Sequence, residues 1–403
     1  MAGRLARSGG GLVFNYGRSY LAREGAISLY EPELPLRAGL LPLTPGLSMP
    51  NSIRDAAPDA WGRRVIINRM LRTKGKDAEP IQLEELTYLL ESGSDRVGAL
   101  DFQSSPAEYI ARQPRSATLS ELQTAAARVE EGVPLTPELD QALFHGSSIG
   151  GARPKAMIAG GDTKYIAKFS AQGDLYSVVK AEFVAMRLAG LAGLDVANVK
   201  LELVAGKDVI LIARFDREKQ ADRWLRRGMV SALTLLELDE MMARYASYEE
   251  LASIVRHRFR GPKMALHQLF GRLVFNVLCG NTDDHARNHA AYWNGKDLRL
   301  TPAYDICPQA RTGNEASQAM LIVGGNRMSK IAVCLEAAPA FLLTGQEATA
   351  IAKKQIEIIL KNWDGVCDEA RLTMIDRQFF WRRQFLNPFA FEGAPKVIQA
   401  LVS

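Results

Sequence analysis

The sequence has few cysteines and no long apolar run. Its cysteines are scattered, with no C-x-x-C pair and no disulfide-like spacing: Cys279, Cys307, Cys334 and Cys367. This usage is typical of a reducing compartment. No segment approaches the roughly 18 apolar residues that span a bilayer, and the basic, glycine-rich stretch from Met1 to Gly17 lacks the apolar run of a signal peptide. We therefore expect a cytoplasmic protein.

The net charge is small, and histidines are few. A formal charge of +5 permits binding to nucleotide phosphates or to an acidic partner, but it does not by itself indicate nucleic acid. Only 5 histidines are present, which disfavours a tight transition-metal site. Apolar residues make up 47% and charged residues 24%, as in globular proteins, and 403 residues suffice for two or three domains with sizeable cores.

The N-terminal half is expected to be rich in β-structure. Its first 50 residues alternate apolar and polar positions around a turn at residues 8–11, which predicts a small β meander. One helix is predicted from Asn51 to about Leu71, and two more helical patterns cover residues 83–90 and 119–129. The following segments are predicted as strand, strand, helix, strand and strand, in the order 157–159, 165–169, 177–191, 199–203 and 209–215.

The chain after Asp216 is expected to be mostly helical. The segment from Ala265 to Cys279 is apolar nearly all round, which is typical of a helix at the centre of a domain. Gly280 ends this helix and begins a polar loop.

That loop contains the most informative spacing in the sequence. Asp283 lies five residues before Asn288, and Asp305 lies seventeen residues after Asn288. Protein kinases place their catalytic base, first metal ligand and second metal ligand in this order. The hairpin signal Asn294-Gly295 lies between them, so a hairpin folding back would bring Asp305 close to Asn288.

The residue types suit phosphoryl transfer. Asp283 is the predicted base that accepts a hydroxyl proton, since positioning matters more than strong basicity in this reaction. Asn288 and Asp305 are predicted to supply hard oxygen ligands to Mg²⁺. His285 is predicted to shape the loop by hydrogen bonding, and Arg287 to offset phosphate charge.

A glycine-rich loop runs from Gly146 to Lys155. Its small residues would let backbone N–H groups approach phosphate oxygens, and Arg153 and Lys155 add positive charge. It is not a Walker motif, which requires G-x-x-x-x-G-K-[ST]. The alternative reading of this loop is a turn between subdomains.

One lysine, Lys168, lies inside the apolar strand 165–169. This placement predicts a contact with nucleotide phosphates, with Glu182 on the following helix as its carboxylate partner. The alternative is a strand lysine that faces water, and Lys164 ranks below Lys168 because it belongs to the turn. Residues 210–217 suit a hinge whose backbone binds adenine, while Phe215 fits core packing equally well.

Taken together, four motifs resemble the HipA family of serine/threonine kinase toxins in bacterial toxin–antitoxin pairs. The residues that match are 148–155, Arg214 to Arg217, Thr282 to Asn288 and Leu300 to Asp305, and the segment Pro58 to Arg64 resembles the family's N-terminal subdomain. The resemblance therefore covers essentially the whole chain.

The resemblance implies an α+β, two-lobed protein-kinase-like fold, distantly related to phosphoinositide kinases. It implies an N-terminal subdomain at 1–100, a β-rich N-lobe at 101–216 with the glycine loop and strand lysine, and a helical C-lobe at 217–403. The implied cofactors are ATP and Mg²⁺. The implied nucleotide-binding residues are Ser148, Ile149, Gly150, Gly151, Ala152, Arg153, Lys155, Lys168, Glu182, Ala213, Phe215 and Tyr304.

The resemblance also implies partners, a protein substrate and a cellular role. The partners would be a HipB-like helix-turn-helix antitoxin, with DNA bound indirectly through it, and a protein substrate of translation such as an aminoacyl-tRNA synthetase. Family members autophosphorylate a serine of the glycine loop, which by position is Ser148, with Ser147 as a rival. Growth arrest and persistence would follow.

Three positions depart from the family pattern. Asp284 stands where a small residue is common, Arg287 where lysine is usual, and Ala213 where an acidic residue is frequent. Asp284 receives no role and is expected to be solvated. Because the base and metal positions are intact, we expect an active enzyme.

Three alternatives remain open. The same fold could phosphorylate a small molecule, or the chain could be a corepressor that mainly holds an antitoxin on DNA. A metallohydrolase built on Asp283, Asp284, His285 and His289 is a further hypothesis.

Overall fold

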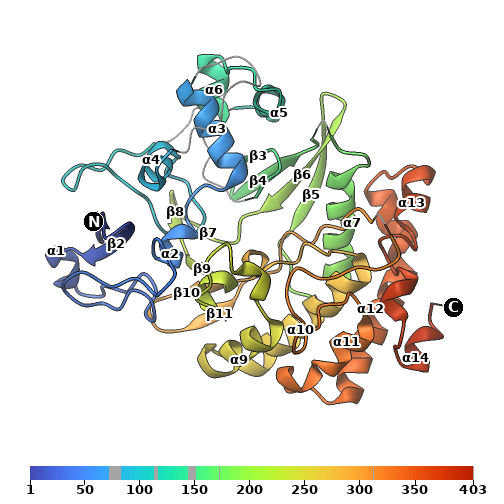
Figure 1. The fold of residues 1–403 in the computed structure, drawn as a ribbon. Helices are drawn as coiled ribbons and strands as arrows, with labels where there is room; N and C mark the ends of the chain where they lie inside the picture. Colours follow the sequence, from blue (N-terminus) through green and yellow to red (C-terminus); the bar gives the residue numbers. More distant parts are fainter. Residues whose placement is uncertain (72–82, 113–116, 144–150, 172, 312, 403) are drawn as a thin grey trace. The chain divides into compact units, whose positions relative to one another are not determined.

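The structure is a computed structural model that describes all residues except 72–82, 113–116, 144–150, 172, 312 and 403 (Figure 1). The chain divides into two compact units. Unit 1 contains residues 1–175 and 200–229, and unit 2 contains residues 176–199 and 230–403. Among the described residues, no helix combines the length and apolar character needed to cross a bilayer. The predicted division into three parts, at residues 100 and 216, stays a prediction.

Unit 1 alternates strands with short helices. Its elements are β1 (Gly3–Ser8), β2 (Gly11–Tyr16), α1 (Arg18–Leu21), α2 (Asn51–Arg54), α3 (Ala60–Leu71), α4 (Glu85–Glu91), α5 (Leu119–Glu130), α6 (Pro137–Leu143), β3 (Lys155–Gly160), β4 (Thr163–Phe169), β5 (Val199–Val204), β6 (Lys207–Ala213), β7 (Arg217–Gln220) and β8 (Arg223–Arg226).

Unit 2 is mainly helical. It contains α7 (Val178–Leu191), the end of β9 (Gly228–Ser231), α8 (Ala232–Leu235), η2 (Ala243–Tyr245), α9 (Tyr248–Arg258), α10 (Pro262–Cys279), η3 (Ala286–Asn288), β10 (Ala290–Trp293), β11 (Leu298–Leu300), α11 (Ile331–Glu336), η4 (Ala338–Phe341), α12 (Gly345–Glu369), α13 (Met374–Phe380), η5 (Pro388–Phe391) and α14 (Lys396–Gln399).

The N-terminal region begins with an antiparallel hairpin of β1 and β2. Its turn uses Gly9 and Gly10 at φ +58° and +85°, a backbone region that glycine enters without steric cost. The turn prediction is therefore confirmed. The predicted meander is wrong beyond this hairpin, because the described chain from there to residue 50 makes two isolated bridges, Phe14 with Leu41 and Tyr30 with Leu34, and no further strand.

The helix predicted from Asn51 to Leu71 is in fact two helices, α2 and α3. Pro58 falls between them, and proline both removes a backbone donor and disfavours helical geometry in the residue before it. The break orients α3 independently of α2. As a result Trp61 and Val65 are buried in a core that also contains residues of α5 and of the sheet.

The central sheet of unit 1 has the strand order β3-β4-β6-β5. Along β4 the side chains of Tyr165, Ala167 and Phe169 alternate into the core with α3 and α5, so Lys168 lies on the opposite face. The strand assignments made from the sequence are confirmed here. The helical prediction after Asp216 is wrong for residues 217–231, where β7 to β9 form, because β7 and β8 are too polar to show an apolar alternation.

Helix α10 is the central element of unit 2, as its all-round apolar sequence predicts. Its buried residues run almost without interruption from Ala265 to Cys279, and it packs against α9, α11 and α12 (Figure 1). Gly280 ends it at φ +72°, and a Cβ at this position would lie 2.8 Å from the carbonyl oxygen of Gln384. Only glycine fits both the backbone conformation and the space.

A buried ion network joins residues 95–98 to the connector after β6. Asp95 lies 3.0 Å from Arg214, 2.8 Å from Arg217 and 2.6 Å from Lys164. Asp216 lies 2.8 Å from Arg214 and 2.9 Å from Arg217, and it accepts a hydrogen bond from the N–H of Gly98. This network ties the N-terminal region to the sheet of unit 1.

We predict that Asp95→Ala strongly destabilises the protein. Removing one partner of a buried charge network leaves Arg214 and Arg217 uncompensated, which typically costs about 3–5 kcal/mol. Urea unfolding of unit 1 measures the loss. Asp162→Ala is the control, because Asp162 pairs with Lys219 on the surface and should leave the midpoint near that of the wild type. Equal midpoints for the two variants would contradict the role of the network.

The same network predicts an acid-sensitive fold. Burial raises the pKa of Asp95, but Arg214, Arg217 and Lys164 outweigh it and hold this pKa well below the usual range. A carboxyl with a lowered pKa stabilises the fold above its unfolded value of about 3.9 and loses that contribution as the pH falls further. Stability should therefore decline more steeply below about pH 4 in the wild type than in Asp95→Ala.

Candidate active site

The loop that follows α10 gathers the residues predicted for phosphoryl transfer. The N–H of His285 donates to the carbonyl of Asp283 at 2.9 Å, and the N–H of Asn288 donates to the carbonyl of His285 at 2.8 Å. His285 thus shapes the loop through its backbone. Asp283 keeps an exposed side chain, whereas Asn288 is buried.

Asn288 is oriented by its own amide. Its Nδ2 donates to the carbonyl oxygen of Asp283 at 3.1 Å, and only the nitrogen of an amide can donate. The amide oxygen must then point away from that carbonyl. Asn288 therefore presents an oxygen, the type of ligand that Mg²⁺ prefers.

The hairpin of β10 and β11 returns the chain as predicted. The strands pair antiparallel, with Trp293 opposite Leu298, and the hydroxyl of Tyr304 donates to the carbonyl of Arg287 at 2.7 Å. Asp305 follows directly, with the unusual φ of +59° for a residue other than glycine. Such strained backbone is concentrated at functional sites.

The hairpin brings the charge of Asp305 within electrostatic reach of Asp283. Partial burial of Asp283 raises its pKa, His285 opposes this effect, and the negative charge of Asp305 raises the pKa further. Two negative charges that repel each other in this way favour the binding of a cation. The carboxylate of Asp305 and the amide oxygen of Asn288 are ligand types that Mg²⁺ prefers, and the side chain of Asp283 is exposed.

Arg287 and Asp284 have partners that the sequence does not suggest. The guanidinium of Arg287 lies 2.5 Å from Glu240, so its charge is compensated within the protein. The prediction that Asp284 is solvated is wrong, because this carboxylate is buried beside Tyr248 and His289. No group of three His, Cys, Asp or Glu side chains that could hold a metal ion occurs in the described residues.

Unit 1 contains the predicted phosphate-binding residues that the structure describes. Lys155 and Lys168 are direct cross-strand partners in β3 and β4, so both side chains lie on the sheet face away from the core. Lys164, by contrast, pairs with Asp95. Two lysines on one face place positive charge where a phosphate is predicted. Ala213 ends β6, and Phe215 is half-buried beyond it.

The end of the glycine-rich loop is held by the N-terminal region. The N–H of Gly151 donates to Asp59, the N–H of Trp61 donates to the carbonyl of Gly151 at 3.1 Å, and the indole of Trp61 donates to the carbonyl of Lys155 at 2.9 Å. Gly151 has φ +102°, and a Cβ there would lie 2.0 Å from Nζ of Lys155. The φ value favours glycine here, whereas the flexible end of Lys155 could shift to make room for a Cβ.

Other predicted residues are placed as follows. Arg153 forms an ion pair of 2.8 Å with Asp174, and Ala152 precedes it in the same segment. Glu182 is buried on α7 in unit 2, whereas Lys168 belongs to unit 1, so their pairing stays a prediction. Ser147, Ser148, Ile149 and Gly150 lie outside the described residues.

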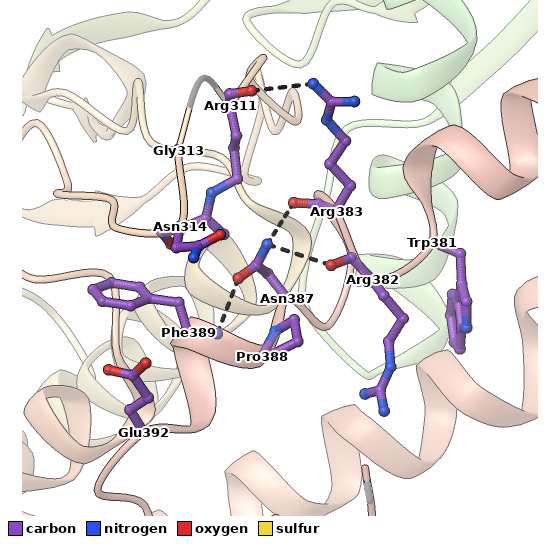
Figure 2. Close-up of a pocket in the computed structure, with 10 residues that line it drawn as sticks. All are labelled: Arg311, Gly313, Asn314, Trp381, Arg382, Arg383, Asn387, Pro388, Phe389 and Glu392. Atoms are coloured by element: carbon purple, nitrogen blue, oxygen red, sulfur yellow. Dashed lines mark hydrogen bonds between the residues drawn. The ribbon is translucent and has the colours of Figure 1, made fainter.

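A cavity of about 820 Å³ lies elsewhere in unit 2 (Figure 2). None of the described residues predicted for the site lines it. Its three arginines, Arg311, Arg382 and Arg383, direct their guanidinium groups away from one another in Figure 2. The cavity therefore lacks the convergent positive charge that would hold a phosphate.

Comparison with known sequences identifies the family. The sequence model of the HipA-like C-terminal domain matches residues 147–363, and that of the HipA N-terminal domain matches residues 1–103. This chain belongs to the HipA family. The C-terminal match contains the loop with Asp283, the hairpin and Asp305, and the N-terminal match contains Asp59 and Trp61.

Relatives of this HipA-family chain are distant. It is 23% identical over 322 residues to a curated protein of Sinorhizobium fredii, covering 74% of this chain and 72% of that protein. It is 25% identical over 232 residues to the serine/threonine-protein kinase toxin HipA of Shewanella oneidensis, covering 49% of this chain and 52% of the toxin. The chain thus matches about half the length of that toxin.

A solved structure shows the same fold. One chain of the complex of HipA, HipB and operator DNA from Shewanella oneidensis shares 20% identity with this chain at a TM-score of 0.70, covering 94% of this chain and 92% of that one. The α+β kinase-like fold expected from the sequence is confirmed.

We predict that Asp305→Asn lowers the pKa of Asp283, because the charge of Asp305 contributes to raising it. Carboxyl ¹³C NMR of aspartate-labelled, metal-free protein measures the shift. Asp297→Asn, in the β10–β11 turn, is the matched control and should leave the pKa of Asp283 where it is. An unchanged value in Asp305→Asn would mean that the two carboxylates are not neighbours.

Proposed function

We propose that this chain is an ATP- and Mg²⁺-dependent serine/threonine protein kinase that serves as the toxin of a toxin–antitoxin pair. The observation that supports this most is the grouping of Asp283, Asn288 and Asp305 at the end of the buried helix α10. A hairpin brings these residues together, although they are distant in sequence. Kinases use this set of groups to activate a hydroxyl and hold a metal.

Each residue then has a role in the reaction. Asp283 accepts the proton of the attacking hydroxyl, which its exposure permits. Asn288 and Asp305 hold Mg²⁺, with the strained backbone at Asp305 fixing the direction of its carboxylate. When bound, Mg²⁺ neutralises charge on the phosphate oxygens. His285 keeps the loop closed around Asp283.

The nucleotide is assigned to residues of the matched C-terminal domain. Lys168 binds phosphate, with Glu182 as its partner, and the glycine-rich segment contributes Ser148, Ile149, Gly150, Gly151, Ala152, Arg153 and Lys155. Ala213, Phe215 and Tyr304 complete the nucleotide-binding set. The cross-strand pair of Lys155 and Lys168 and the glycine-specific backbone of Gly151 support this assignment.

The likeness to the Shewanella oneidensis complex supports partners of the same kind. We assign to this chain a HipB-like helix-turn-helix antitoxin and operator DNA bound through that antitoxin. The protein that receives the phosphate would be one that takes part in translation, such as an aminoacyl-tRNA synthetase. Persistence would follow from its phosphorylation.

We predict that Asp283→Asn abolishes phosphate transfer from labelled ATP to protein. Losing the base should lower the rate by about 10²–10⁴-fold, while affinity for ATP is kept, because Asp283 does not hold the nucleotide in this mechanism. Incorporation of ³²P into protein and equilibrium binding of ATP measure the two properties. Asp297→Asn should label like the wild type.

The outcomes separate the rival functions. Wild-type labelling of Asp283→Asn would refute the assignment of the base. Nucleotide binding without turnover in the wild type would favour a corepressor, and transfer only to small acceptors would favour a small-molecule kinase. Phosphate release supported by Mn²⁺ or Zn²⁺ without transfer would favour a hydrolase.

Autophosphorylation is predicted at Ser148. A phosphoserine adds about two negative charges to a segment that receives nucleotide phosphate, so modification should inactivate the enzyme. Phosphopeptide mass spectrometry after incubation with ATP locates the phosphate. Modification confined to Ser147, or full activity with both serines phosphorylated, would contradict this prediction.

A further inference from the structure

A buried polar cluster lies on the inner side of the catalytic loop. The hydroxyl of Tyr248 donates to Oδ2 of Asp284, and Nε2 of His289 lies 3.0 Å from Oδ1 of the same carboxylate. The Tyr248 oxygen and His289 Nε2 are 3.1 Å apart. All three residues are at least 97% buried, with exposed fractions of 0%, 1% and 3%.

Hydrogen-bond donors surround the buried carboxylate of Asp284. Burial raises its pKa, but His289, Tyr248 and the amide of Asn276 outweigh this effect and hold the pKa below the usual range. A buried charge is costly unless donors surround it, and here three donors do so. Such a charge is retained most readily where its directional hydrogen bonds specify a geometry.

The cluster touches both ends of the proposed catalytic segment. Asp284 directly follows Asp283, and His289 directly follows Asn288. In the first pair Asp284 is buried and Asp283 is exposed, and in the second pair both residues are buried. Because three donors hold the carboxylate of Asp284, the adjoining backbone that carries the exposed Asp283 is fixed as well.

The cluster also reaches the second metal-binding segment. Nδ2 of Asn281 donates to Oδ1 of Asn276 at 3.0 Å and to the carbonyl of Asp305 at 3.4 Å. Asn276 also bonds Asp284. A continuous set of buried hydrogen bonds therefore connects α9, α10 and the backbone at residues 283–289 and 305.

We propose that Asp284, His289 and Tyr248 form a positioning clamp that holds Asp283 and Asn288 in the geometry required for phosphoryl transfer. The inference rests on the proposed kinase function. None of the three touches the reacting atoms, so each is a positioning residue that acts through its neighbour. Asp284, which departs from the family pattern, thereby acquires a role that it shares with His289 and Tyr248.

The most conservative test is Tyr248→Phe, which removes one hydroxyl and keeps the ring packing. We expect kcat to fall about 10-fold or more, because small displacements of reacting groups cost up to about 10²-fold, while KM for ATP stays within about twofold. Amide hydrogen exchange of residues 283–289 should become faster. Exchange does not depend on activity, so it reports on the clamp directly.

Tyr16→Phe is the matched control. Tyr16 is buried in unit 1, its hydroxyl donates to the carbonyl of Leu34 at 2.7 Å, and it accepts from the N–H of Leu29 at 2.8 Å. This variant should also lower thermal stability, yet leave kcat and exchange of residues 283–289 unchanged. If both variants lose similar stability but only Tyr248→Phe loses kcat, the effect of Tyr248 is on the position of the loop and not on stability in general.

His289 offers a test by rescue. His289→Phe keeps an apolar ring of similar size but removes the donor to Asp284, so kcat should fall. His289→Gln restores an amide donor and should recover most of the activity. Asp284→Ala combined with His289→Phe should lose no more than Asp284→Ala alone, because the two residues act as one unit.

Wild-type kcat and unchanged exchange in both Tyr248→Phe and His289→Phe would overturn the clamp. A His289→Gln variant as impaired as His289→Phe would overturn the role of the donor. If the wild type transferred no phosphate at all, the proposed function would fail, and hydrogen exchange of residues 283–289 would still decide whether the clamp exists.

Discussion

The candidate site depends on the repulsion between Asp283 and Asp305. Desolvation raises the pKa of Asp283 most, and the negative charge of Asp305 raises it further. The surrounding structure keeps them together nonetheless. Helix α10 ends at a position only glycine can occupy, and the β10–β11 hairpin fixes how far the chain travels before it returns. Such an arrangement is stable when a cation is shared, which is the chemistry that phosphoryl transfer requires.

Structural support for the site comes from buried polar groups rather than from apolar packing alone. In unit 2, Asp284 with its three donors fixes the loop from its inner side. In unit 1, Asp59 and Trp61 hold the backbone at Gly151, and the network of Asp95 and Asp216 joins the N-terminal region to the sheet. The HipA N-terminal domain therefore contributes directly to the segment in which nucleotide binding is proposed.

Elements with a strong periodic pattern could be predicted from the sequence. The alternation in β4 and the apolar character of α10 identify both correctly, since burial on one face or all round leaves a clear signature. The break at Pro58 and the polar strands β7 and β8 were predicted wrongly, because their conformation follows from neighbours rather than from local hydrophobicity. The burial of Asp284 was predicted wrongly for the same reason. A charged residue in a polar loop gives no sign of Tyr248, which lies 36 residues earlier.

The order Asp283, Asn288 and Asp305, with Asn294-Gly295 between them, was sufficient to suggest the chemistry, because catalysis constrains residue type and a tight turn constrains spacing. The direction of each side chain was not contained in that order. A hydrogen bond within the loop decides which amide atom Asn288 presents. Bonds between distant segments decide that Asp284 rather than Asp283 is buried, and that Lys164 meets a carboxylate of the N-terminal region. Such bonds form only once the chain has folded, since they connect residues that have no local relation to one another.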